Sequence, residues 1–430
     1  MALITLPRVL ELGAFVAFDE PLYWPWSNQF FQALQNGDWA GTIVGRGHPG
    51  IMVLLIQCLG LAARYGWAVL TGLPSPQALT QLHLDQETIV FFDLAARRLP
   101  MALCNVLLLL GLLWLVQRQF GRNVALVATI LLALDPFLLS DSRTLRGDAL
   151  MATLMTSSAI CMLVYLTEYR WRYLFLSGAA MGLALANKTS TVAILPFIGL
   201  VILAFALWRV RQDRWTAGVG WGLMSGLAWS GTAVAVFWAV WPALWVTPGP
   251  ALAWMFHFAF DTSFDGGRLN YFMGQLSTED PFPLFYLVTI PLRLSPLVMI
   301  GLMVSVVEIT FAGQRRTLIT QLKTWFNCQT PPFFKPNPTL TALGLSLYAL
   351  SIWFVITVGY LKRDHYALPL FPALDILGAI GLVRLAAVLI KKWVTHHAQF
   401  LSQPRWGLYC WFKRQYRCPI IRIITHISTR

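Results

Sequence analysis

The sequence predicts an all-α, polytopic membrane protein with about ten transmembrane helices in a single bundle. Of its 430 residues, 57% are apolar and only 12% are charged, whereas soluble domains carry charge on about 25% of their positions. Apolar runs of the ~20 residues that a helix needs to cross a bilayer recur along the chain. These observations exclude a soluble globular enzyme, a disordered chain and a disulfide scaffold.

Nine apolar runs are long enough to span a membrane, and each is predicted to form one transmembrane helix. Two further runs, at 1–18 and 49–70, are shorter or interrupted by charge. The nine runs lie near 99–117, 123–140, 148–166, 173–187, 189–208, 217–241, 288–309, 340–360 and 366–390.

The connections between these runs alternate in charge along the chain. Lys and Arg accumulate in cytoplasmic loops of membrane proteins, so the net charge of +13 indicates topology rather than binding to nucleic acid. The basic connections are predicted to be cytoplasmic and the acidic ones to face outward. The basic set comprises 118–122, 168–172, 209–215, 310–338 and a cytoplasmic tail at 391–430, and the acidic set comprises 71–98, 141–147, 242–287 and 361–365.

The run at 49–70 allows two arrangements that both keep the charge rule. In one, 1–18 spans the membrane and 49–70 lies along the outer interface, within a first outer loop at 19–96. In the other, 49–70 is the first span and Asp19 is cytoplasmic. The residues Arg64, Tyr65 and Trp67 suit an interfacial helix, so we expect the first arrangement, with residues 1–390 as the membrane domain.

Two adjacent carboxylates, Asp19 and Glu20, follow the first apolar run. Carboxylates at a membrane boundary are costly unless they are solvated, paired or functional. In an aqueous cleft, one of them could take a proton from an attacking hydroxyl. The alternative is an ordinary solvated loop start.

Several cations stand at turns on the predicted outer side, where they could hold an anion. Arg46 and His48 lie in GRGHPG, Lys188 splits a long apolar stretch in NKTS, and Arg363 lies in KRDHY. Glycines let a backbone approach an anion closely, and Arg binds phosphate in a bidentate manner. The alternatives are a Gly/Pro turn, a lysine that reaches the headgroups, and an internal pair with Asp364.

The connection at 141–147 leads into an apolar helix that begins near Asp148. A carboxylate there is stabilised by the helix dipole, so simple capping is the alternative to a functional role. In the loop at 242–287, His257 and nearby acids could ligate a metal, but their spacing matches no metal-binding motif. No metal site and no cofactor are therefore expected.

In order along the chain, these pieces resemble one family. The motifs are FDEP, HPG, ARRLP, FGR, LDPFLLSDSRTLRGDAL, NKTS, WPALWV, PLFYLVTIPLRLSP and RDHYALPLFPALD, from about Asp19 to about Leu382. The series resembles the bacterial polyprenyl-phosphate-dependent glycosyltransferases that are related to protein O-mannosyltransferases and lipid A aminoarabinose transferases, which have the GT-C fold.

The resemblance implies an inverting hexosyl- or pentosyltransferase in the plasma (inner) membrane, with its active site on the extracytoplasmic side. Its donor would be a polyprenyl-phosphate sugar and its acceptor a hydroxyl of a protein, lipid or glycan. It also places 49–70 as a juxtamembrane helix. A secondary transporter or flippase for a lipid-linked or anionic substrate is the alternative, although transporters place ionisable groups near the bilayer midplane.

The resemblance also implies a role for each candidate residue. Asp19 matches the general base and Glu20 its neighbour in the family's first outer loop. In the second loop, Asp148 matches the family's acid, with Arg143 upstream. The donor phosphate would be held by His48, Lys188 and Arg363, with His48 standing where the aminoarabinose transferases have Lys. Arg46, in the same loop as His48, is a further cation that we expect to bind the phosphate.

Overall fold

The computed structural model describes residues 1–17, 19–45, 47–71, 86–212, 215–264, 269–311 and 338–401. The chain divides into two compact units, Met1–Leu382 and Val383–Arg430. The second is described only as far as Leu401, where it consists of the end of the last helix.

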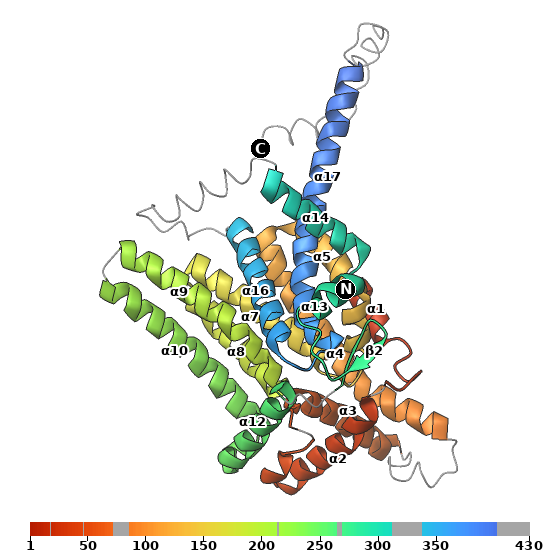
Figure 1. Cartoon of the computed structure of the whole chain (residues 1–430). Coiled ribbons are helices and arrows are strands. Elements are labelled where there is room, and N and C mark those ends of the chain that lie inside the picture. The colour runs from red at the N-terminus through yellow and green to blue at the C-terminus, as the bar shows by residue number, and fades with distance from the viewer. Residues whose placement is uncertain are drawn as a thin grey trace. The chain divides into compact units, whose positions relative to one another are not determined.

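The described chain is almost entirely helical (Figure 1). The first half comprises α1 Ala2–Val9, α2 Glu20–Asn36, η1 Ala40–Thr42, α3 Ile51–Thr71, α4 Gln86–Phe120, α5 Arg122–Leu134, α6 Pro136–Ser142, α7 Asp148–Glu168 and α8 Trp171–Asn187. The second half comprises η3 Thr189–Ile194, α9 Leu195–Gln212, α10 Trp215–Val240, α11 Ala243–Val246, α12 Pro248–Phe264, β1 Asn270–Phe272, β2 Gln275–Ser277, α13 Leu284–Arg293, α14 Pro296–Phe311, α16 Pro338–Val358, η5 Asp364–Leu370 and α17 Phe371–Leu401.

The prediction of an all-α polytopic membrane protein is confirmed. In the described part of the chain, β1 and β2 are the only strands, and they pair as one antiparallel hairpin. Within the described residues, six helices are long and apolar enough to span a membrane, or eight if two bent pairs each count as one span. This is fewer than the ten expected. One reason is α1, whose eight residues rise only about 12 Å, less than half of the ~30 Å hydrocarbon core.

Two apolar runs that were predicted to form single helices are broken in the structure. The run at 123–140 divides into α5 and α6, bent by 62°, and the run at 288–309 divides into α13 and α14, bent by 116°. A proline follows each break, and proline removes a backbone donor and disfavours helical geometry in the residue before it. At the first break the Asp135 carboxylate caps α6, accepting from the Leu138 amide at 2.6 Å.

Helix α7 lies at the centre of the bundle. In its most apolar window 94% of the residues are buried, against 22% for α10, whose remaining surface is available to lipid. Helices gain little from apolar contact with one another in lipid, so buried hydroxyls and close packing hold them together. Accordingly, the Ser158 hydroxyl of α7 donates to the Ser177 carbonyl of α8 at 2.8 Å, and the Trp229 indole of α10 donates to the Ser177 hydroxyl at 2.9 Å.

The segment between α1 and α4 forms a folded unit around α2 and α3. Arg97 of α4 is buried, binds Asp93 at 2.8 Å and donates to Asn28 of α2 at 3.0 Å, while Arg64 of α3 pairs with the same Asp93. The Arg97 guanidinium and the Asp93 carboxylate thus connect α4 to α2 and to α3. That α3 is a juxtamembrane helix stays a prediction.

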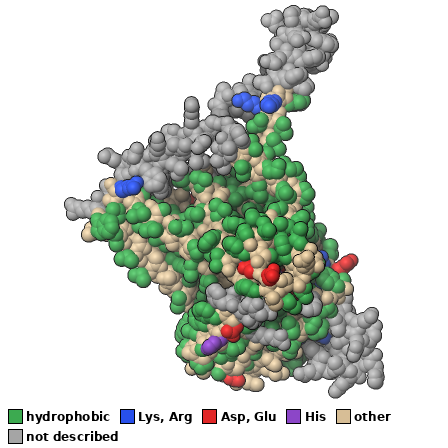
Figure 2. Space-filling model, viewed as in Figure 1, with side chains coloured by type: hydrophobic (Ala, Val, Ile, Leu, Met, Phe, Trp, Pro, Cys, Tyr) green, Lys and Arg blue, Asp and Glu red, His purple; other side chains and the backbone are tan. Residues whose placement is uncertain are grey.

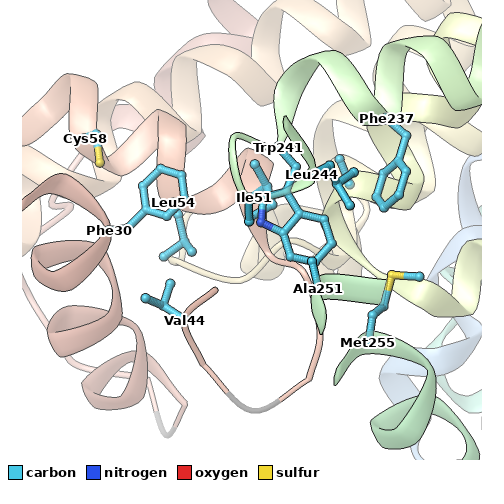
Figure 3. Close-up of a cluster of buried hydrophobic side chains, with 12 residues drawn as sticks. Phe30, Val44, Ile51, Leu54, Cys58, Phe237, Trp241, Leu244, Ala251 and Met255 are labelled. Carbon is cyan, nitrogen blue, oxygen red and sulfur yellow. The ribbon is translucent and has the colours of Figure 1, made fainter. Parts of the chain in front are cut away.

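A cluster of buried apolar side chains joins this unit to the segment after α10 (Figure 3). Phe30 and Leu54 come from α2 and α3, whereas Trp241 directly follows α10 and Met255 comes from α12. The cluster brings together two segments that are about 200 residues apart in sequence. Figure 2 shows hydrophobic side chains over most of the visible face, with acidic ones at the end that carries α2, α12 and the hairpin.

The contact between α14 and α17 depends on glycine. A Cβ atom added to Gly301 would lie 2.1 Å from the backbone oxygen of Gly378. We expect Gly301→Ala to force the helices apart and to destabilise the fold by about 1–3 kcal/mol, measured as a lower melting temperature in detergent. Gly199→Ala on α9, where a Cβ meets nothing within 4 Å, is the matched control. Equal melting temperatures for the two variants would contradict the close contact.

Candidate active site

Six segments meet around a cavity of about 250 Å³. They are the start of α2, the loop before α3, the start of α7, the α8–η3 junction, α12 and η5. The cavity has an acidic, a basic and an aromatic lining. Its polar side chains with ionisable groups are Asp19, Tyr23, His48, Arg146, Asp148, Lys188, His365 and Tyr366.

Asp19 lies at the mouth of this cavity with its side chain 39% exposed. It is the residue that precedes α2, but its carboxylate makes no capping hydrogen bond with that helix. The carboxylate instead faces Arg146, whose Nε lies 3.6 Å from Oδ2. Arg146 also lies 3.4 Å from Asp141 and 3.5 Å from Asp148. Asp19 is therefore held loosely and keeps its lone pairs available to another group.

The end of α8 and the start of α7 bring a second acid and a cation into the cavity. The Lys188 ammonium donates to Asp148 Oδ1 at 2.6 Å and lies 5.3 Å from the centre of the Tyr366 ring. Burial opposes the charge of Lys188, but the carboxylate of Asp148 outweighs it, so the pKa of Lys188 is raised. Lys188 directly follows the last residue of α8 and has an extended backbone. Its hydrogen bond to Asp148 holds the ammonium in place, so Lys188 is a fixed cation.

His48 stands edge-on to Phe258, with ring centres 4.7 Å apart. Gly47 has a φ of +92°, and a Cβ there would lie 2.0 Å from Phe258, so this turn requires glycine. Burial, and then the Lys188 ammonium, lower the pKa of His48 to about 3. His48 is therefore neutral in this structure, and its buried Nδ1 has no hydrogen-bond partner.

Glu20 does not line the cavity, although it follows Asp19 directly. It is fully buried and accepts from Arg98 Nε at 2.8 Å, from the Leu145 amide at 2.9 Å and from the Ala17 amide at 2.7 Å. Arg98 also donates to the carbonyls of Leu12 and Phe15 at 2.6 and 2.8 Å. This buried ion pair ties α4 to the chain on both sides of the cavity.

Three further candidates from the sequence do not reach the cavity or lie outside the described residues. Arg143 donates to the carbonyl of Leu10. Arg363 donates to the carbonyl of Leu269 at 3.2 Å. Arg46 lies outside the described residues. The structure thus brings together Asp19, His48, Asp148 and Lys188 from the predicted set.

Four lining residues were missed as site residues by sequence reasoning. Arg146 lies three residues after Arg143 in the same short connection, and the sequence contains no feature that favours one over the other. His365 and Tyr366 follow Arg363 in the same loop, so the loop was found but not the side chains that face inward. The fourth, Tyr23, lies one turn into α2, where burial raises its pKa to about 12 and keeps its hydroxyl protonated.

A second cavity of about 190 Å³ adjoins the first and shares His48, Lys188 and Tyr366 with it. Its other walls are mostly apolar and come from α7, η3, α12, α16 and η5, including Met155 and Ile352. A polar and an apolar cavity thus meet at one lysine, whose side chain is largely buried. No group of three or more His, Cys, Asp or Glu side chains suited to a metal occurs within the part of the chain that the structure describes.

Residues 88–241 match the family model described as dolichyl-phosphate-mannose-protein mannosyltransferase. The chain is similar to the crystal structure of ArnT from Cupriavidus metallidurans bound to undecaprenyl phosphate, with a TM-score of 0.51 and 17% identity over 94% of this chain and 63% of that one. No curated protein matches the sequence.

A further similar structure is the Archaeoglobus fulgidus oligosaccharyltransferase in the apo form, with a TM-score of 0.48 and 14% identity over 93% of this chain and 51% of that one. The chain therefore spans less than two thirds of either solved structure. The helical arrangement is shared with ArnT at the level of the fold. The protein accordingly has the GT-C fold of membrane glycosyltransferases, and its residues 88–241 carry the sequence pattern of the mannosyltransferase family.

Proposed function

We propose that the protein moves a single sugar from a polyprenyl-phosphate carrier to a hydroxyl acceptor, with inversion at the sugar carbon. The observation that supports this most directly is the meeting of the two cavities. One contains an accessible carboxylate, Asp19, and the other is mostly apolar, and a largely buried cation, Lys188, lines both of them. A lipid-linked sugar phosphate needs these three environments in this order: polar for the sugar, cationic for the phosphate and apolar for the lipid.

In the proposed reaction Lys188 holds the donor phosphate, and the Asp19 carboxylate takes the proton from the acceptor hydroxyl. The hydroxyl oxygen attacks the sugar carbon from the face opposite the phosphate. A bond forms to that oxygen while the bond between the sugar carbon and the phosphate oxygen breaks, and its electrons leave with the polyprenyl phosphate. A fixed cation in a site of low dielectric constant stabilises the charge that develops on the leaving phosphate.

The other cation of the polar cavity has a different role in this proposal. Arg146 is placed between Asp19 and two further carboxylates, so it orients the Asp19 carboxylate toward the acceptor. Asp148 in turn fixes the position of the Lys188 ammonium at 2.6 Å. These two are positioning residues, whereas Asp19 and Lys188 contact the reacting groups.

The lipid tail would lie in the apolar cavity, between α7, η3 and α16. Support for this class of carrier comes from the similar ArnT structure, which is bound to undecaprenyl phosphate. The alternating charge of the loops favours the extracytoplasmic side of the plasma membrane for this site. The same rule favours a cytoplasmic tail at 391–430, most of which lies outside the described residues.

The test is direct incubation of the purified full chain with polyprenyl-phosphate hexoses and pentoses labelled in the sugar. We expect release of polyprenyl phosphate together with label on a hydroxyl acceptor, with the configuration at the sugar carbon inverted. The control omits the acceptor. Movement of intact donor between the leaflets of a vesicle, with no cleavage, would instead identify a flippase and overturn the proposal.

A further inference from the structure

The charged side chains that the structure describes around the polar cavity leave no surplus positive charge for a phosphate. Among the described residues that line it, the two permanent cations, Arg146 and Lys188, are matched by the carboxylates of Asp19 and Asp148. A fifth group, Asp141, lies behind Arg146 at 3.4 Å. A donor phosphodiester therefore brings a negative charge into a site whose lysine and arginine are already neutralised.

His48 is the ionisable group best placed to correct this imbalance. It lies on the border of the two cavities together with Lys188 and Tyr366, which is where the phosphate between a sugar and a lipid tail must lie. Its Nδ1 is buried and has no hydrogen-bond partner in this structure. A buried polar atom without a partner is rare and calls for an explanation, and at the border of the two cavities a ligand that bonds to the ring supplies one.

We propose that His48 takes up a proton when the phosphate of a polyprenyl-phosphate ligand binds, so that a neutral imidazole becomes the imidazolium that holds the phosphate. This rests on the proposed function and adds to it a coupling between donor binding and proton uptake. The proton comes from solvent and resides on the imidazole, and no covalent bond to the ligand forms.

The groups that face His48 determine the direction of this coupling. The Lys188 ammonium and burial favour the neutral ring, while Asp148 favours the charged one, and His365 opposes it when protonated. From the other walls of the cavity, Asp19, Arg146, Tyr23 and Tyr366 face the same space. A phosphate at the shared border adds a negative charge next to the ring, and a nearby opposite charge raises the pKa of a histidine.

The sign of the pH dependence follows by linkage. Below the low pKa of His48 in the free protein, the ring is charged with or without ligand and affinity does not depend on pH. Between that pKa and the raised pKa of the complex, the complex holds one more proton, so Kd rises up to about tenfold for each pH unit. Above the pKa of the complex, Kd is again constant and binding is weak.

The experiment uses the full chain in detergent and a polyprenyl methyl phosphodiester, a probe whose single negative charge does not titrate near neutral pH. Calorimetry at pH 4, 5 and 6, repeated in buffers with different enthalpies of ionisation, yields both Kd and the number of protons taken up. An opposite charge close by raises a pKa by about 1–3 units, so the value of about 3 in the free protein becomes at most about 6 in the complex. We expect Kd to rise by up to about tenfold per pH unit within this window, with the largest proton uptake at its acidic end and little uptake at neutral pH.

Variants assign the proton to a residue. We expect His48→Gln to bind weakly with no pH dependence and no uptake, and His48→Lys to bind without uptake because its charge is permanent. His257→Gln, on the exposed face of α12 next to the wall residue Phe258, is the matched control and should behave as wild type.

Two results would overturn the inference. Tight wild-type binding with no proton uptake would show that another cation, such as Arg46, already neutralises the phosphate. Uptake that persists in His48→Gln but disappears in His365→Gln would move the proton to the other histidine. No wild-type binding at pH 4 would instead contradict the proposed carrier, which keeps the two failures distinct. The wild-type proton count decides the matter even if a variant does not fold.

Discussion

Asp19→Asn is expected to reduce kcat for sugar transfer by about 10³-fold while leaving the affinity for polyprenyl phosphate unchanged. The amide has nearly the same size and can still face Arg146, but it cannot accept a proton from the acceptor hydroxyl. Because the carboxylate makes no cap hydrogen bond with α2, the variant should fold as the wild type does. The measurement is the rate of polyprenyl phosphate release, with Kd determined in parallel.

A control for this prediction lies in the same segment of chain. Asp38 accepts from the Gly41 amide at 2.9 Å in an exposed position and does not line the cavity. Asp38→Asn should retain wild-type kcat. If Asp19→Asn turned over at the wild-type rate, another group would have to accept the proton.

Glu20→Ala is expected to destabilise the protein by about 3–5 kcal/mol, because it leaves Arg98 as an uncompensated charge in a buried site. Arg98 is only 1% exposed, and the amides of Ala17 and Leu145 lose their acceptor as well. Melting temperature in detergent and resistance to protease are the measurements. Glu20→Gln keeps an acceptor for these donors and should lose less stability.

This comparison separates a structural from a catalytic role for Glu20. Glu279→Ala, an exposed acid near the hairpin, is the matched control and should melt as the wild type does. If Glu20→Ala kept the wild-type melting temperature but lost kcat, Glu20 would react with substrate as the sequence suggested, and its buried pair with Arg98 would not explain its presence.

Hydropathy predicted the helices well because a spanning helix must bury its whole backbone in lipid and therefore leaves a long apolar run. Hydropathy could not place the breaks at Asp135 and Ser295, because the residues on both sides of each bend are equally apolar. The sequence does contain a signal of another kind, since a proline follows each break. Whether proline bends a span or is accommodated depends on neighbouring helices.

The candidate site was predictable only in part. The sequence singled out four residues that line the cavity, because an ionisable group next to an apolar run is energetically costly and therefore indicates a function or a partner. These residues are Asp19, His48, Asp148 and Lys188. Their partners were not found, since Arg146 and its neighbour Arg143 are distinguished only by the direction in which each side chain leaves a short loop. That direction is decided by packing between segments far apart in sequence.

Glu20 shows a second limit of the same kind. It stands beside Asp19, and an adjacent pair of carboxylates looks like one unit in the sequence. A helix begins at Glu20 and turns its side chain toward Arg98 of α4, while Asp19 remains in the preceding turn. Two neighbours thus receive opposite environments because successive side chains at the start of a helix point about 100° apart around its axis.

The shared border of the two cavities has a consequence for how a lipid-linked donor would arrive. Moving a hydrocarbon tail from a bilayer into water costs ~0.8 kcal/mol for each CH₂ group, so a long polyprenol cannot leave its leaflet to enter from solution. An apolar chamber that opens directly onto the lysine-bearing wall lets the headgroup slide in sideways with its tail still solvated by lipid or protein. Turnover would then depend on the concentration of carrier within the membrane plane, not in the bulk phase.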